Sequence, residues 1–92
     1  MMINNPYQIE VINRIRQLRI DREVSQIGLA NIIGVSNGQI GNIESLKFKH
    51  KYTLKQLYQI ATHFKVTIDW VLTGEDSPLS TDDLIKALIN YE

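Results

Sequence analysis

Residues 25–44 hold two helical patterns separated by one glycine, and this spacing constrains the fold more than any other feature of the chain. Ser25 is a favourable N-cap, and the apolar residues that follow it recur at helical spacing as far as Ile33. Gly34 can end that helix because glycine adopts the left-handed conformation at little cost. The pattern predicts a short helix over about 26–33.

A second helix is expected directly after that turn, over about 37–45. Ser36 is its predicted N-cap, and Ile40 and Ile43 are its apolar positions. Ala30 is small enough to let the second helix cross the first at close range. The segment therefore predicts two helices joined by a tight turn.

The rest of the chain is also predicted to be helical. Residues that can cap a helix precede apolar positions spaced by three and four, which places further helices at about 6–21, 54–64, 68–73 and from 81 onward. The predicted caps of these helices are Asn5, Thr53, Thr67 and Ser80. The resulting fold class is all-α.

Several of these residues match a known family in order and spacing. The matching residues are Ser25-Gln26, Leu29-Ala30, Gly34-Val35-Ser36, Ile40 and Ile43-Glu44, followed by the runs 54–61 and 64–75. Across roughly 12–75, the chain resembles the phage-repressor-like (Cro/C1, XRE) family of helix-turn-helix DNA-binding domains. The resemblance implies a lambda-repressor-like five-helix DNA-binding domain over 1–76, with an additional C-terminal helix over 77–92.

The resemblance also implies which residues would touch double-stranded DNA, since the second helix of such a motif enters the major groove. The matching positions are Gln26, Ser36, Asn37, Gly38, Gln39, Gly41 and Asn42. An asparagine can donate to and accept from an adenine edge at once. Two alternatives stay open: in one, Gln26 only supports its cap or the neighbouring helix, and in the other, the polar face of the second helix is only solvated.

Two glycines depart from the family pattern, because Gly38 and Gly41 stand where longer polar side chains are usual. Each costs roughly 0.5–1 kcal/mol relative to alanine inside a helix. Either the backbone approaches the groove closely or the helix becomes ordered on DNA. In both cases few side chains remain to read bases, so the sequence predicts modest specificity per half-site and a homodimer.

A basic loop follows the predicted second helix of the motif. Lys47, Lys49 and Lys51 alternate there with other residues and are expected to neutralise phosphates. Phe48 and Tyr52 are expected to fill the core or the loop rather than stack on bases. The family also suggests an ion pair between Arg19 and Glu44, which would tie the first helix to the second helix of the motif. Losing one partner of such a pair costs about 3–5 kcal/mol if it is buried.

The charge of the chain is zero overall but unevenly distributed. Residues 1–65 carry nine basic and four acidic side chains, a balance of +5, whereas residues 66–92 carry one basic and six acidic side chains, a balance of −5. The basic part suits phosphates. The alternative is ordinary surface charge that happens to sort by segment.

No residue pattern indicates catalysis or a cofactor. The chain has no cysteine, which excludes disulfides and thiolate metal sites. His50 and His63 lack the spacing of a zinc site, and no nucleophile elbow or phosphate-binding loop is present. The expectation is therefore a protein that is not an enzyme and has no cofactor or metal. No apolar run could span a membrane and no secretion signal is evident, so a cytoplasmic location is expected.

The C-terminal helix carries an apolar stripe whose role the sequence leaves open. Leu84, Ile85, Leu88 and Ile89 could form a dimer contact or a lid on their own domain. The favoured function is a DNA-binding transcriptional regulator, acting as a repressor on an inverted repeat. The alternatives are an antitoxin paired with a toxin or another regulatory protein, and an interaction module that has lost DNA binding.

Overall fold

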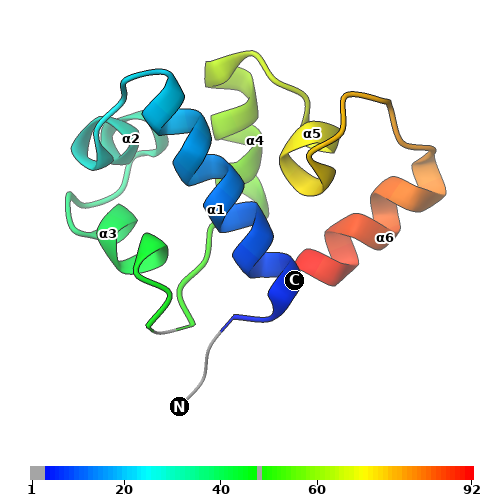
Figure 1. Ribbon diagram of the computed structural model, residues 1–92, viewed down its shortest axis with the longest axis horizontal. Coiled ribbons are helices and arrows are strands. Elements are labelled where there is room, and N and C mark those ends of the chain that lie inside the picture. Colours follow the sequence, from blue (N-terminus) through cyan, green and yellow to red (C-terminus); the bar gives the residue numbers. More distant parts are fainter. Residues whose placement is uncertain (1–3, 48) are drawn as a thin grey trace.

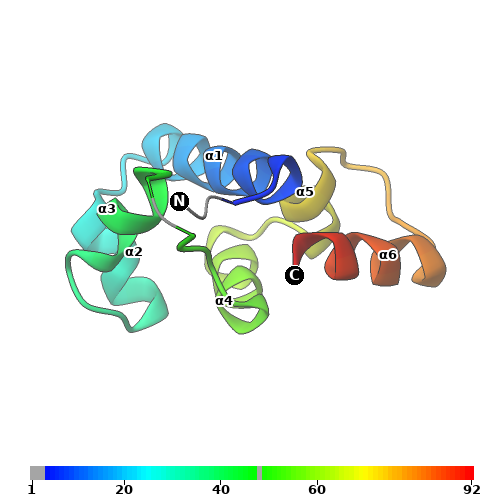
Figure 2. The ribbon, with the colours of Figure 1, turned by 90° about the horizontal axis from the view of Figure 1, so that it is seen from below.

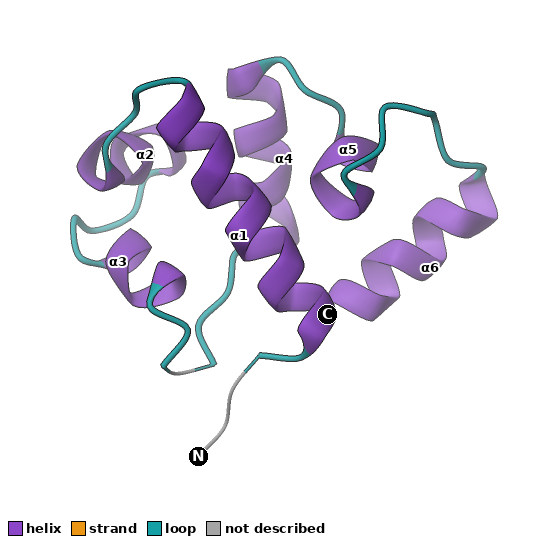
Figure 3. Ribbon diagram, in the orientation of Figure 1, coloured by secondary structure: helices purple, strands orange, loops and turns teal. Residues whose placement is uncertain are grey.

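The computed structural model describes residues 4–47 and 49–92, and in these residues the chain forms helices and no strands. The helices are α1 (Pro6–Asp21), α2 (Gln26–Ile33), α3 (Gln39–Glu44), α4 (Leu54–Phe64), α5 (Ile68–Thr73) and α6 (Thr81–Tyr91). Figure 3 shows their arrangement by secondary structure. The prediction of an all-α fold is confirmed.

Five helices begin directly after the residues that were predicted to cap them. The side chains of Asn5, Ser25, Thr53, Thr67 and Ser80 each accept a hydrogen bond from the backbone N–H three residues later. Each bond satisfies one of the N–H groups that have no partner inside the helix. Gly34 and Gly74 end α2 and α5 in the left-handed conformation, with φ of 72° and 77°.

The start of α3 differs from the prediction. Ser36 does not cap this helix, whose N-cap is Gly38 and has no side-chain hydrogen bond. The backbone N–H of Gln39 instead donates to the carbonyl of Ser36 at 3.0 Å. Residues 36–39 thus form a turn before the helix, because an Asn-Gly pair favours a turn over a first helical turn. α3 is consequently limited to Gln39–Glu44, shorter than the predicted 37–45.

One apolar core joins all six helices of the described residues. α1 crosses the middle of the molecule, with α2 and α3 at one end and α5 and α6 at the other (Figure 1). Turned by 90°, α4 and α6 lie on the same side of α1 (Figure 2). Tyr52, just before α4, is fully buried, which confirms its predicted place in the core. Phe48, predicted to have a similar role, lies outside the described residues.

The end of α6 is held against the beginning of α1 and the segment before α4. The amide of Gln8 donates to the Tyr91 carbonyl at 2.6 Å, and the Tyr91 hydroxyl donates to the Tyr52 carbonyl at 2.6 Å. Both bonds are buried and join residues more than 35 positions apart. They bring the two ends of the described chain side by side, as Figure 1 shows. α6 therefore shares the core of the preceding helices.

The predicted apolar stripe of α6 divides between the core and the surface. Leu84 and Leu88 pack against the core, beside the buried Ala87 and Tyr91. Ile85 and Ile89 are 49% and 67% exposed. Half of the stripe thus covers its own domain, and the other half faces solvent.

Candidate nucleic-acid interface

The packing of α3 against α2 sets the position of the helix predicted to enter DNA. Ile40 and Ile43 of α3 are fully buried, as are Leu29 and Ala30 of α2. The apolar side of α3 is thereby fixed to the domain, and its polar side is left outward. That the small side chain of Ala30 allows a close crossing of the two helices stays a prediction.

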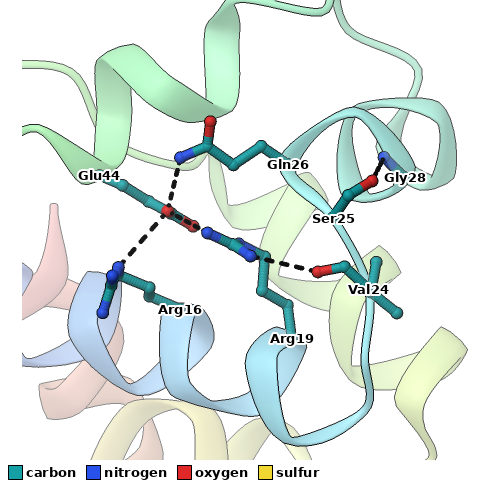
Figure 4. A network of polar contacts seen from close by, with 7 residues as sticks. All are labelled: Arg16, Arg19, Val24, Ser25, Gln26, Gly28 and Glu44. Atoms are coloured by element: carbon teal, nitrogen blue, oxygen red, sulfur yellow. Dashed lines mark hydrogen bonds and ion pairs between the residues drawn. The ribbon is translucent and has the colours of Figure 1, made fainter.

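A polar network at the C-terminal end of α3 holds the helix to α1 and α2 (Figure 4). The Nε and Nη2 atoms of Arg19 donate to the two carboxylate oxygens of Glu44 at 2.7 and 2.6 Å. The Gln26 amide donates to Glu44 Oε1 at 3.0 Å, and Arg16 lies 3.7 Å from the same oxygen. Arg19 also donates to the Val24 carbonyl at 3.1 Å, in the link between α1 and α2. The ion pair suggested by the family resemblance is present, and Arg16 is an additional partner that the sequence did not indicate.

The environment of Glu44 favours its charged form. Burial by itself raises the pKa of this carboxyl, but the hydrogen bonds from Arg19 and Gln26 and the two arginine charges lower it below the ordinary value. The hydrogen bond to Glu44 in turn raises the pKa of the Arg19 guanidinium. The side chains of Arg19 and Glu44 are only 10% and 4% exposed. The pair is therefore buried and charged on both sides.

The predicted DNA-contacting residues around α3 lie in one continuous part of the chain. The exposed ones are Ser36, Asn37, Gly38 and Asn42, whereas Gln39 and Gly41 are partly buried. Gln26 is exposed at the start of α2, and its amide is bound to Glu44. The possibility that Gln26 supports the neighbouring helix is thus realised, with its carbonyl oxygen still directed away from Glu44 (Figure 4).

The three predicted phosphate-binding lysines do not share one environment. Lys47 and Lys49 are exposed in the loop after α3. Lys51 is partly buried, and its ammonium group donates to the Glu92 carbonyl at 2.8 Å and lies 5.4 Å from the centre of the Tyr91 ring. Lys51 therefore contacts the end of α6, whereas Lys47 and Lys49 are exposed to solvent.

Two arginines of the basic segment have similar contacts. Arg14 donates to the Val71 carbonyl in α5 at 2.7 Å, and Arg22 donates to the Phe64 carbonyl at the end of α4 at 3.0 Å. A cation at the C-terminus of a helix satisfies unpaired carbonyls and interacts favourably with the helix dipole. The +5 balance of residues 1–65 therefore overstates the charge available to phosphates, because several of these cations bind carbonyls within the protein.

Two structural features are absent from residues 4–47 and 49–92. No group of three or more His, Cys, Asp or Glu side chains there is placed to hold a metal ion. None of the described helices is long and apolar enough to cross a membrane.

Comparison with known proteins adds one finding. A family model described as a helix-turn-helix domain matches residues 12–77, which include α2, the turn at Gly34 and α3. No curated protein matches the chain. The matched range ends before α6 begins at Thr81.

Proposed function

We propose that the chain, which belongs to the helix-turn-helix domain family, is a sequence-specific DNA-binding regulator of the Cro/C1-like type. One observation carries the proposal: α3 is anchored to α1 by the buried Arg19–Glu44 pair and to α2 by a hydrogen bond from Gln26 to Glu44, while Asn37 and Asn42 stay exposed. A helix that reads base edges must be rigidly placed and must present hydrogen-bonding side chains outward.

Asn37 and Asn42 would read base edges from the turn and from the outer face of α3. Both side chains are exposed, and an asparagine amide matches the donor and acceptor of adenine in the major groove. Lys47 and Lys49, which are exposed in the following loop, would neutralise phosphates and make binding dependent on salt. Ser36, Gly38 and Gln39 would contact the sugar-phosphate backbone of the DNA or flanking bases.

The regulator would act as a repressor, with two copies on an inverted repeat. α3 has only six residues, and Gly38 and Gly41 add no side chain to it, so one copy has few groups with which to distinguish bases. Two copies related by a twofold axis would place their helices about 34 Å apart along one face of the duplex. Ile85 and Ile89 are the exposed part of the α6 stripe and would supply the contact between copies. Such a regulator would work in the cytoplasm.

The test is selection of bound duplexes from a random pool at two salt concentrations. Enrichment of an inverted repeat, with binding that weakens steeply as salt rises, would support the whole proposal. Enrichment of a single half-site would support sequence-specific DNA binding and contradict the proposed homodimer. No enrichment at low salt would refute DNA binding and direct attention to protein partners, including a toxin.

Matched variants would assign the contact residues. Asn37→Ala and Asn42→Ala should each weaken binding to the selected site by about 1–3 kcal/mol and relax the preference at one base pair. Asn13→Ala is the control, because Asn13 is an exposed asparagine on α1. If the control weakens binding as much as the two α3 variants, the assignment of the interface is wrong.

A further inference from the structure

Lys51 links the basic loop after α3 to the last turn of α6. Its Nζ atom donates to the Glu92 carbonyl at 2.8 Å and to the Tyr91 carbonyl at 3.5 Å. The same ammonium group lies 5.4 Å from the centre of the Tyr91 ring. A cation suits this place, because the last carbonyls of a helix have no partner inside it and carry the negative end of the helix dipole.

The last turn of α6 is also held in place by contacts that do not involve Lys51. The Tyr91 hydroxyl donates to the Tyr52 carbonyl at 2.6 Å, and the Tyr91 carbonyl accepts from the Gln8 amide at 2.6 Å. The buried side chain of Ala87 packs one turn earlier on the same helix. α6 therefore keeps a cation site beside the basic loop, and Lys51 occupies it.

Occupation of this site excludes a direct contact between Lys51 and a phosphate. An ammonium group has three N–H donors, and here two carbonyls and an aromatic ring surround it. A groove of about 320 Å³ lined by both Lys51 and Tyr91 opens there, so the lysine side chain has room to turn outward without a change in the backbone. Lys47 and Lys49, in the same loop, are exposed and have no such contact with α6 printed in the structure of the described residues.

We propose that α6 and DNA compete for Lys51, so that docked α6 restrains DNA binding by holding this lysine away from phosphates. The inference rests on the proposed DNA-binding function and extends it to a regulatory contact within the chain. α6 begins at Thr81, after the residues 12–77 that match the helix-turn-helix model. The restraint therefore comes from an element outside the matched domain, and displacing that element releases one more cation to the DNA.

The salt dependence of binding to a non-specific duplex counts the lysines that contact phosphates. The slope of log K against log salt becomes shallower by about 0.9 for each contact that is lost. Lys47→Met and Lys49→Met should each show this change. Lys51→Met should leave the slope at the wild-type value, because Lys51 is bound to α6. Lys86→Met, which removes an exposed lysine of α6 itself, is the matched control and should also keep the wild-type slope.

Loosening α6 should bring Lys51 into contact with DNA. Tyr91→Leu removes the ring beside the ammonium group and the hydroxyl bound to Tyr52, and Ala87→Glu places a charge on the buried face of α6. In either background the slope should steepen by about 0.9, and adding Lys51→Met should remove that gain. Tyr91→Phe keeps the ring and should keep the wild-type slope. Melting curves would confirm that each variant is folded.

Two outcomes would overturn the inference alone. A shallower slope for Lys51→Met in the otherwise wild-type protein would show that Lys51 binds phosphate with α6 in place. An effect of Lys51→Met that is no larger in the two α6 variants than in the wild-type protein would show that α6 does not withhold the lysine. Failure of the proposed function is distinguishable, because then the wild-type protein itself would not bind the duplex at low salt, and this inference would fail with it.

Discussion

Replacing Glu44 with glutamine should sharply destabilise the protein, because Glu44 balances a buried guanidinium. Two charge-assisted hydrogen bonds of 2.7 and 2.6 Å join it to Arg19, and the two side chains are only 10% and 4% exposed. Removing one partner of a buried pair costs about 3–5 kcal/mol. Glutamine keeps the volume and one acceptor oxygen, which places Glu44→Gln at about 3 kcal/mol.

That loss is a large fraction of the free energy of unfolding expected for a domain of this size. A free energy of unfolding of about 0.05–0.15 kcal/mol per residue is typical. At about 4–8 °C per kcal/mol, a loss of about 3 kcal/mol should lower the melting temperature by about 12–24 °C. Thermal and urea unfolding at pH 7, followed by far-ultraviolet circular dichroism, would measure both quantities.

Two further variants distinguish the cost of burying an unpaired charge from the cost of losing an exposed ion pair. Arg16→Met removes a partner that lies 3.7 Å from Glu44 and is 52% exposed, so its cost should stay under about 1 kcal/mol. Replacing both members of the pair, as in Arg19→Met/Glu44→Leu, leaves neither charge buried and should cost less than Glu44→Gln alone. If Glu44→Gln melts within about 2 °C of the wild-type protein, the argument from a buried ion pair is refuted.

Three more predictions concern acid stability, α6 and the turn of the motif. Because the folded pKa of Glu44 is lowered, its contribution to stability is present above the ordinary glutamate pKa of about 4.3 and is lost as pH falls through the folded pKa. The difference in unfolding free energy between wild type and Glu44→Gln should therefore shrink between pH 5 and pH 3 in urea titrations, and a constant difference would contradict this. Tyr91→Phe leaves the buried Tyr52 carbonyl without its 2.6 Å partner and should cost about 1–3 kcal/mol in the same titrations, whereas an unchanged midpoint would show that the bond is dispensable. Gly34→Ala forces a side chain into a left-handed residue of φ 72° and should destabilise by about 1 kcal/mol, while Gly38→Ala, at φ −81° with open space around it, should not; equal melting temperatures of the two variants would refute the strain.

The helices could be predicted from the sequence because their signals are local. A capping side chain reaches a backbone N–H only three residues away, and apolar residues three or four apart share one face whatever the rest of the chain does. The same locality explains the error at α3. Both Ser36 and the Asn37-Gly38 pair carry local preferences, and the turn preference of the pair outweighed the capping preference of Ser36.

The candidate site could be predicted only in part. Its location around α3 and the Arg19–Glu44 pair came from resemblance to a family, since no local rule joins residues 25 positions apart. The residue pattern leaves open whether Gln26 contacts DNA or supports its cap or the neighbouring helix, and it does not indicate the hydrogen bond to Glu44. The Gln26 Oε1 atom lies 3.4 Å from the position that a Cβ atom would occupy at Gly41, and this proximity depends on the distance between α2 and α3, which residue spacing does not contain.

The sequence alone therefore determined the helix boundaries set by caps and glycines, the buried faces of the helices and the class of the fold. Only the tertiary structure decided which cationic side chains bind groups within the protein. Arg14, Arg22 and Lys51 donate to helix-terminal carbonyls 57, 42 and 41 residues away. It also decided that Leu84 and Leu88 turn inward while Ile85 and Ile89 do not. The physical reason is that a helix pattern fixes which residues share a face. Only the packing of the whole chain decides what each face, and each long charged side chain, will meet.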